Sequence, residues 1–397
     1  MSVYSGPEIP NSGLVFLYDM ANTQKSWKGM PTTNLLPQPL SFQTGYTLES
    51  WTGELEDNTT RTTAPDGTYT ATRIKRTTGY IYKRNTTSPT FTISPGQTVT
   101  FSCWIRKLDD TSQAGLGIYI WCYNGAGSGN RALASQPVYR DSWVLQSVTY
   151  TALTGETDFS FGFCGAHSFT SEIAIWHPQV EISTIATPFV NGTRSNTQAI
   201  LDLTNNNTIT ATSLTYASDG TFSFNGTSNR LNLGDPASGL LDFGTNSFTL
   251  EAWFKLAYLP NAWTGIIHKG SSGTQGYAMD INPSNYLTAS IQGISGSNQH
   301  SAGYLLSANT WYHAVIVFNR VVNMQFYING NLVSTASYAT GNDSSVDTGA
   351  ALFIGAATDT PQWTFPGSIT KTAIYNRALS ATEVQQNFEA VRGIYGL

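Results

Sequence analysis

The sequence has few charged residues, and this shortage excludes several classes of protein. Charged residues make up 11% of the 397-residue chain, against roughly 25% in ordinary soluble domains. The formal net charge is −5 and no lysine- and arginine-rich cluster occurs. This argues against nucleic-acid binding, because phosphate contacts need basic patches. Ser, Thr, Asn and Gly fill the gap, which suits strands, turns and surfaces that meet protein or sugar.

Cysteines and long apolar runs are also scarce, and the first residues lack the pattern of a leader sequence. The three cysteines, Cys103, Cys122 and Cys164, are odd in number and lie in strand-like sequence, so we expect buried small hydrophobic side chains rather than disulfides. The opening MSVYSGPEIPNSG lacks a basic segment followed by an apolar run, so we expect no signal peptide. No window approaches the ~18 apolar residues of a membrane span. Synthesis and assembly in a reducing cytoplasm are expected.

Alternation of apolar and polar residues dominates what is present. In 247–256, SFTLEAWFKL, Phe248, Leu250, Ala252 and Phe254 form one alternating set, which is typical of a β-strand with one face in a core. The stretches WYHAVIVF (311–318) and MQFYI (324–328) continue the theme, and Asn329-Gly330 then predicts a tight hairpin turn.

Similar short strands, separated by turn signals, fill the chain on both sides of about residue 192. Only the C-terminus predicts a helix, where Ser380 and Glu383 form a capping box ahead of Val384 and Phe388. The predicted fold class is all-β, with two antiparallel β-sandwich jelly rolls and a short C-terminal helix.

The C-terminal block contains, in order, FSFNGTSNRLNLG (222–234), SFTLEAWFKL, NTWYHAVIVFN (309–319), FYINGNLV (326–333), LFIGA (352–356) and FPGSITKTAIYNRALSATEVQQNF (365–388). Through these stretches it resembles the concanavalin A-like, laminin-G/pentraxin-type jelly rolls. Members of this family often open with a strand like GLVFLYDMAN (13–22), soon followed by a segment like ILDLTNNNTIT (200–210). Here about 170 residues separate the two segments, so we expect a domain inserted after the first strand.

The expected boundaries follow from that insertion. Residues 1–12 form an N-terminal arm, 13–33 hold the first strand of the C-terminal jelly roll, 34–191 form the inserted sandwich, and 192–397 form the rest of the host sandwich. The insert resembles carbohydrate-binding-module-like jelly rolls through NLLPQP (34–39), Trp51, APDGTYTATRIKR (64–76), VTFSCWIRK (99–107) and the closing IWHPQVEISTIATPFVNGTR (175–194).

Such pairs of modules are similar to those in tail, fibre and head-decoration proteins of bacteriophages. The resemblance implies a virion protein that contacts other virion proteins, forms a homo-oligomer and touches host surface glycans, with no nucleic acid bound and no membrane insertion. Two alternatives stay open. One is a dedicated glycan-binding adhesin, and the other, less favoured, is a polysaccharide-degrading enzyme.

Catalytic motifs are missing from the sequence. Glycoside hydrolases need two carboxylates that flank the scissile bond, but Glu251 stands alone in its strand and Glu181 has no acidic partner at strand spacing. The five histidines lack metal-ligand spacing, and His313 alternates with Val315 and Val317 as a structural histidine would. We therefore expect a protein that is not an enzyme.

Calcium is the single cofactor candidate, because related jelly rolls often hold it at one rim with Asp and carbonyl oxygens. Asp280, Asn282, Asp343 and Asp347 are the candidates by loop position. The competing interpretation, which we favour, is that these are turn residues that cap their own backbone.

Aromatic residues carry the glycan hypothesis. In LGIYIWCY (116–123), Ile118, Ile120 and Cys122 point one way while Tyr119, Trp121 and Tyr123 point the other. The second set is expected to line an outer face, with Trp104 and Arg106 on a neighbouring strand. Trp263 and Trp363 lie in loop-like sequence of the second domain and are further candidates. For both groups the alternative is packing under a loop, against the other domain or at a subunit contact.

Overall fold

The computed structural model confirms the all-β fold class. It describes residues 8–20, 26, 28–36, 46–87, 90–109, 117–125, 127–134, 137–140, 142–163, 171–216, 222–270, 275–293, 296–338, 345–360 and 362–397. The chain forms two compact units, one made of residues 1–30 and 196–397 and the other of residues 31–195. We call these the outer unit and the inserted unit. No helix in the described part of the chain has the length and apolar character to cross a membrane.

The first sheet of the outer unit is built from eight antiparallel strands. Its order is β13-β14-β25-β16-β21-β22-β23, with β1 also paired to β25. The strands are β1 (Leu14–Asp19), β13 (Thr215–Tyr216), β14 (Phe222–Asn225), β16 (Phe248–Leu256), β21 (Trp311–Asn319), β22 (Asn323–Ile328), β23 (Asn331–Ala336) and β25 (Pro366–Tyr375). The predicted hairpin turn joins β22 to β23, where Asn329 and Gly330 both have positive φ, +50° and +77°.

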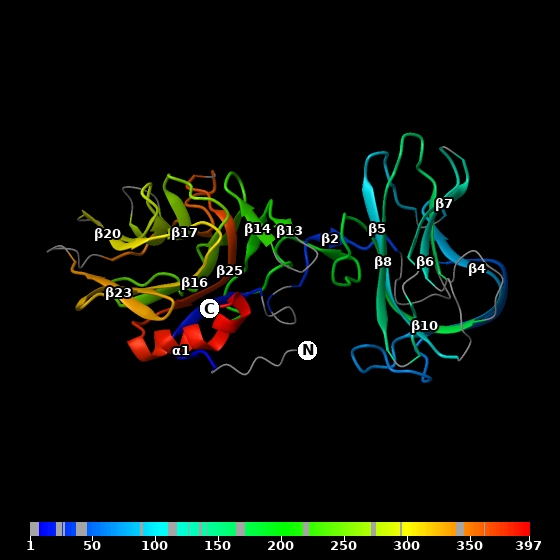
Figure 1. Cartoon of the computed structure of the whole chain (residues 1–397), viewed down its shortest axis with the longest axis horizontal. Coiled ribbons are helices and arrows are strands. Elements are labelled where there is room, and N and C mark those ends of the chain that lie inside the picture. The colour runs from blue at the N-terminus through cyan, green and yellow to red at the C-terminus, as the bar shows by residue number, and fades with distance from the viewer. Residues whose placement is uncertain are drawn as a thin grey trace. The chain divides into compact units, whose positions relative to one another are not determined.

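The second sheet of the outer unit has seven strands in the order β12-β15-β24-β17-β18-β19-β20. They are β12 (Thr210–Thr212), β15 (Arg230–Gly234), β17 (Thr264–Lys269), β18 (Gly276–Ile281), β19 (Tyr286–Gly293), β20 (Gly296–Leu305) and β24 (Leu352–Ile354). Alternate residues of both sheets meet in one core that includes Phe248, Phe254, Met279, Ile291 and Ile316. The two sheets therefore form a sandwich (Figure 1).

Strand β1 lies far from its partners in sequence. Its residues 14–19 pair with residues 371–375 of β25. The buried Asp202 carboxylate holds the strand in place, since Oδ1 accepts from the Leu17 backbone N–H at 3.0 Å. The N-terminal strand is thus part of the sheet that the C-terminal block builds.

The C-terminal helix α1 (Ala381–Val391) covers the other face of the first sheet (Figure 1). It begins at the predicted capping box, in which Ser380 and Glu383 satisfy each other's backbone N–H groups. Val384 packs with Val315, Val317 and Tyr375 on that face. A 3₁₀ turn, η1 (Arg392–Tyr395), follows the helix.

The large sheet of the inserted unit has eight strands in the order β7-β6-β9-β4-β10-β5-β8, with β3 also paired to β4. They are β3 (Thr47–Glu56), β4 (Thr72–Arg84), β5 (Thr98–Lys107), β6 (Ile118–Cys122), β7 (Gly129–Ala134), β8 (Val144–Thr151), β9 (Phe159–Phe163) and β10 (Ser171–Ile182). Strand β4 branches, because residues 72–76 pair with β10 while residues 81–84 pair with β9.

The two branches face each other across one core. Phe101 of β5 contacts Phe161 and Phe163 of β9, at ring-centroid distances of 5.8 and 5.4 Å, although the strands share no ladder. Cys103 and Cys122 are fully buried in this core, as predicted. Cys164, like His167 and Asp343, lies outside the described residues.

A small two-stranded ladder marks where the chain enters and leaves the inserted unit. Strand β2 (Thr32–Thr33) pairs with β11 (Thr193–Arg194). Beside it, the buried Glu181 carboxylate accepts hydrogen bonds from the Thr32 hydroxyl, the Gln179 amide and the Thr187 backbone. These bonds give Glu181, near the end of β10, a structural role.

Candidate functional site

The outer face of the β4-β9-β6-β7 branch presents a group of aromatic side chains. Ile118, Ile120 and Cys122 point into the core, so alternation turns Tyr119 and Trp121 outward. Trp121 and Tyr123 are partly exposed and lie side by side, with ring centroids 6.5 Å apart. We call the surface formed by Tyr119, Trp121, Tyr123 and Arg84 the aromatic face.

Tyr119 forms the floor of the aromatic face. It pairs directly with Gly162 of β9, and its ring lies across that glycine so closely that a Cβ there would be 2.1 Å from the ring. Only 8% of Tyr119 is exposed. Tyr119 therefore supports its neighbours and presents little surface of its own.

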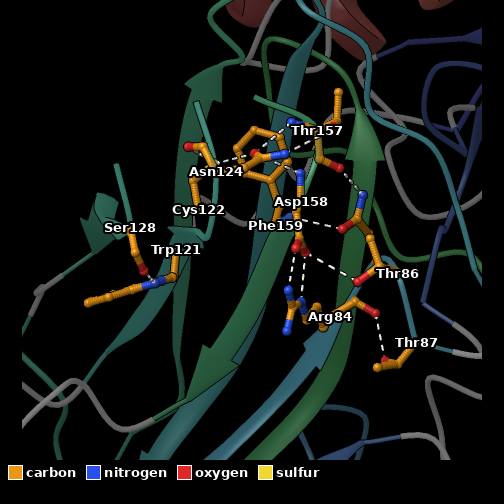
Figure 2. Close-up of polar contacts among 11 residues, drawn as sticks. Arg84, Thr86, Thr87, Trp121, Cys122, Asn124, Ser128, Thr157, Asp158 and Phe159 are labelled. Carbon is orange, nitrogen blue, oxygen red and sulfur yellow. Dashed lines mark hydrogen bonds and ion pairs between the residues drawn. The ribbon is translucent and has the colours of Figure 1, made fainter. Parts of the chain in front are cut away.

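The indole of Trp121 is fixed by a loop contact. Its Nε1 donates to the Ser128 hydroxyl at 3.0 Å, as Figure 2 shows. The loop that carries Ser128 is held from below by Arg131, whose Nη2 donates to the Gly127 carbonyl and whose Nε donates to Glu156. The ring of Trp121 is thus oriented before any ligand arrives.

Glu156 is a fully buried anchor for this loop. Its carboxylate accepts from Arg131 Nε at 2.6 Å, from the Tyr150 hydroxyl at 2.7 Å and from the Leu153 backbone N–H at 3.0 Å. Burial alone would raise the pKa of Glu156, but these donors hold the pKa below its ordinary value. The carboxylate stays charged and keeps the loop in place.

Tyr123 is covered by a cation. The guanidinium carbon of Arg84 lies 4.0 Å from the ring centroid, a cation–π contact. Both Arg84 Nε and Nη2 donate to the two oxygens of Asp158, and this pairing lowers the pKa of Asp158. Figure 2 shows the Arg84–Asp158 pair below Asn124, whose side chain binds residues 157 and 158.

One polar group on this face is unpaired. Ser160 lies opposite both Arg84 and Trp121 in the strand registers. Its buried hydroxyl makes no hydrogen bond, which is uncommon for a buried polar atom. The aromatic face therefore combines ring surfaces and a fixed Arg–Asp pair, with the Ser160 hydroxyl buried in the strand between them.

Trp104 does not join this face, and the predicted adjacency of its strand is wrong. Strand β5 pairs with β10 and β8, whereas β6 pairs with β7 and β9. Trp104 lies opposite Trp176 and Leu145, on the outside of the other branch. Because the two branches face each other across the core, their outer side chains point in opposite directions.

Trp263 and Trp363 do come together, on the outer unit. Their ring centroids are 5.6 Å apart and both rings are partly exposed. Trp363 has φ +52°, an unusual conformation for a bulky residue. Its ring and the ring of His268 form a T-shaped pair with centroids 5.5 Å apart. His268 Nδ1 lies 3.2 Å from the buried Asp280 carboxylate. This Trp pair is a second, smaller aromatic site.

The predicted calcium ligands do not assemble into a site. Asp280 lies within β18 rather than in a loop, and its carboxylate faces His268. Asn282 Oδ1 accepts from the backbone of Ser284 and Tyr286, and Asp347 Oδ1 accepts from the Gly244 backbone. Asn282 thus caps its own turn, as in the favoured interpretation, whereas the carboxylates of Asp280 and Asp347 contact residues elsewhere in the chain. Within the described ranges no group of three or more His, Cys, Asp or Glu side chains is placed to hold a metal ion.

Sequence reasoning missed the polar partners of the aromatic face. Arg84, Ser128, Glu156 and Asp158 come from three separate segments, and no spacing links them to Trp121. The one available signal was local: Asp158 directly precedes β9, and Arg84 ends β4.

Comparison with known proteins identifies one family and several similar structures. Residues 225–385 match the family model described as the concanavalin A-like lectin/glucanases superfamily. No curated protein matches the chain. Among solved structures, the binding domain of Paraclostridial Mosquitocidal Protein 1 is 18% identical with a TM-score of 0.39, over 48% of this chain and 49% of that one.

Two further structures show the same level of similarity. The botulinum neurotoxin serotype G binding domain is 19% identical with a TM-score of 0.40, over 48% of both chains. Domain 4 of AbnA, a GH43 extracellular arabinanase from Geobacillus stearothermophilus, in complex with arabinotriose, is 20% identical with a TM-score of 0.36, over 49% of this chain and 93% of that one. The chain spans about half the length of the two toxin binding domains.

Proposed function

We propose that this protein binds glycans without cleaving them, through the aromatic face of the inserted unit. The observation that carries the proposal is the geometry of Trp121 and Tyr123, two partly exposed rings 6.5 Å apart, each fixed by a polar partner. Ring faces offer apolar surface to the CH groups of a sugar, and nearby polar groups orient its hydroxyls.

Preorganisation favours this use of the face. Binding costs free energy when side chains must be ordered. Here the Ser128 contact already holds Trp121, and the Arg84–Asp158 pair already covers Tyr123.

The proposal excludes bond cleavage at this face. Its carboxylate, Asp158, receives two hydrogen bonds from Arg84, and this pairing lowers its pKa. A general acid in glycoside hydrolysis needs the opposite, a raised pKa and a free proton. We infer reversible binding.

The Trp263–Trp363 pair is the second candidate glycan site. Two aromatic rings in loops, above a buried His268–Asp280 pair, present a similar combination of ring surface and fixed polar groups. With one site in each unit, a single chain would bind a polysaccharide at two points, which raises avidity without any stronger single contact.

We place this binding on the surface of a bacteriophage particle, in a tail-fibre, baseplate or head-decoration protein that attaches the particle to its host. The resemblance of the paired modules to such proteins supports this setting. Repeated copies in a homo-oligomer, in contact with other virion proteins, would convert weak single sites into firm attachment. The competing role is a virion structural protein whose aromatic face contacts another virion protein instead of sugar.

The test is binding of the purified chain to envelopes and isolated polysaccharides of candidate host bacteria. Trp121→Ala should weaken binding by about 10- to 100-fold, in the range of an interface hot spot. Trp104→Ala is the matched control, since Trp104 is also partly exposed but lies on the opposite branch. Its binding should equal that of the wild type.

Two outcomes would contradict the proposal. Unchanged binding by the folded Trp121→Ala variant would remove the aromatic face as the site, and loss only in Trp263→Ala would move it to the outer unit. Absence of binding to every envelope and polysaccharide would favour the structural role, which co-sedimentation with virion proteins then tests.

A further inference from the structure

A lysine is buried at one end of the second sheet of the outer unit. Lys269 is the last residue of β17 and is 1% exposed. Lysines are almost never buried unless their charge is compensated. Four oxygen atoms surround the ammonium group. Two come from the chain that follows β15, and two come from the segment that precedes β24.

The oxygens form a cage at hydrogen-bonding distance. Lys269 Nζ lies 2.5 Å from Asp235 Oδ1 and 3.2 Å from Asp242 Oδ1. It also donates to the backbone carbonyls of Thr348 and Ala350, each at 3.0 Å. Asp242 Oδ1 is buried and makes no hydrogen bond, so the ammonium charge is what compensates it.

Sheet register explains why these groups meet. Strand β24 lies between β15 and β17, and its residue Leu352 pairs with Gly234 on one side and Lys269 on the other. Asp235 follows β15 directly, Asp242 lies in the next loop, and residues 348–350 lead into β24. Ile267 points into the core. Lys269 lies two residues later in the same strand, so its side chain points to the same face and lies under these loops at the end of the core.

The local charge is negative even with the lysine present. Asp235 and Asp242 carry two charges against one ammonium, and Asp347 lies in the same region. Burial raises the pKa of Tyr277, the register partner of Lys269, and the charges of Asp242, Asp235 and Asp347 raise it further. The cage therefore has the charge to hold a divalent ion.

We propose that Lys269 occupies a calcium-type cation site, so that the native protein needs no calcium at this rim, and that removal of the lysine converts the cage into a calcium site. Two carboxylates and two carbonyls are ligands that calcium prefers, with water completing its 6–8 oxygens. Calcium–oxygen distances of 2.3–2.6 Å require less contraction of the cage than the 2.0–2.1 Å of magnesium. In the native protein the Lys269 ammonium group, rather than a bound ion, compensates the charges of Asp235 and Asp242.

The experiment is calcium titration of the full chain, wild type and Lys269→Ala, by calorimetry and thermal unfolding. The wild type should bind no calcium at the cage, and neither calcium nor a chelator should shift its midpoint. Lys269→Ala should unfold at lower temperature in chelator, bind one calcium per chain, and regain about 5–10 °C at calcium about 100 times its Kd. Magnesium should act more weakly.

Controls make the result specific. Lys269→Ala combined with Asp235→Asn removes one charged ligand and should lose at least about tenfold in calcium affinity. Lys269→Met, which keeps the apolar stem, is titrated in parallel in case the alanine variant packs poorly. Two results would overturn the proposal. One is a wild type whose unfolding midpoint falls in chelator. The other is that both lysine variants, folded or unfolded without calcium, neither bind calcium nor gain stability from it.

Discussion

Gly162 provides a sharp test of how the aromatic face is built. A Cβ at this position would lie 2.1 Å from Cζ and 2.2 Å from the hydroxyl oxygen of Tyr119. Ordinary contact begins at 3.4 Å, so Gly162→Ala requires the ring to move by about 1.3 Å. The backbone itself accepts alanine, because Gly162 is not among the residues with positive φ.

The magnitude follows from what opposes that movement. Tyr119 is 8% exposed and packs on the strand beneath it, so Gly162→Ala should cost about 1–3 kcal/mol of unfolding free energy, as overpacked sites do. In a Tyr119→Ala background the clash is absent. There the same substitution should cost nothing or stabilise by a few tenths of a kcal/mol, since alanine restricts the unfolded chain.

The assay is a double-mutant cycle by urea denaturation of the full chain. The four proteins are the wild type, Gly162→Ala, Tyr119→Ala and the double variant, and the expected coupling energy is about 1–3 kcal/mol. Gly129→Ala, at another strand glycine whose nearest neighbour would be 3.4 Å away, is the control and should change little. Equal costs of Gly162→Ala in both backgrounds would refute the steric argument.

Two further predictions concern pH. Burial lowers the pKa of His177 to about 4, although the negative charge of Asp66 acts to raise it. The unfolded state then takes up the proton first, near pH 6.5, so the inserted unit should lose stability as pH falls from about 6.5 to 4. His177→Asn, which tolerates the φ of +52°, should flatten the urea-denaturation profile in that window, whereas a flat wild-type profile would contradict the argument. The Arg377 guanidinium lowers the pKa of Glu383 to about 2, so its contribution is complete above about pH 4.5 and vanishes toward pH 2. Glu383→Gln should cost about 1–2 kcal/mol at pH 7 and almost nothing near pH 2 in the same assay, and an equal cost at both pH values would count against the ion pair between Arg377 and Glu383.

Local sequence patterns predicted local structure well. Alternation in 116–123 indicated which side chains face the core, and Ile118, Ile120 and Cys122 are indeed fully buried. The Asn329-Gly330 turn and the Ser380–Glu383 capping box formed where the residues indicated. These features depend on neighbours within four residues, so a single sequence contains what is needed.

Long-range neighbours could not be predicted in the same way. Alternation places Trp104 outside its strand but does not say that β5 lies next to β8 and β10 rather than β6. The branching of β4 decides that arrangement, and branching depends on pairings tens of residues apart. The polar groups around Trp121 were missed for this reason.

The Lys269 cage is an extreme case of the same difficulty. Its oxygens come from residues 235, 242, 348 and 350, which no spacing motif unites. Loop position was the signal that made Asp343 and Asp347 calcium candidates, and it does not extend to a strand residue such as Lys269. A lone lysine at the end of an apolar strand was the relevant signal, because its charge must find compensation when the strand is buried.

The pairing of β1 with β25 also sets an order of events during protein synthesis. The inserted unit is continuous from residue 31 to 195 and can fold once it has left the ribosome, whereas β1 waits for about 350 more residues before its partner exists. At about 5–20 residues per second this delay lasts roughly 20–70 s. Throughout that time the nascent chain carries LVFLYD (14–19) as an unpaired apolar strand, and such segments associate readily with other chains. A cell that makes this protein in quantity therefore has to shield this segment until β25 has been synthesised. A circular permutant that begins at β14 and places β1 after α1 would remove the need.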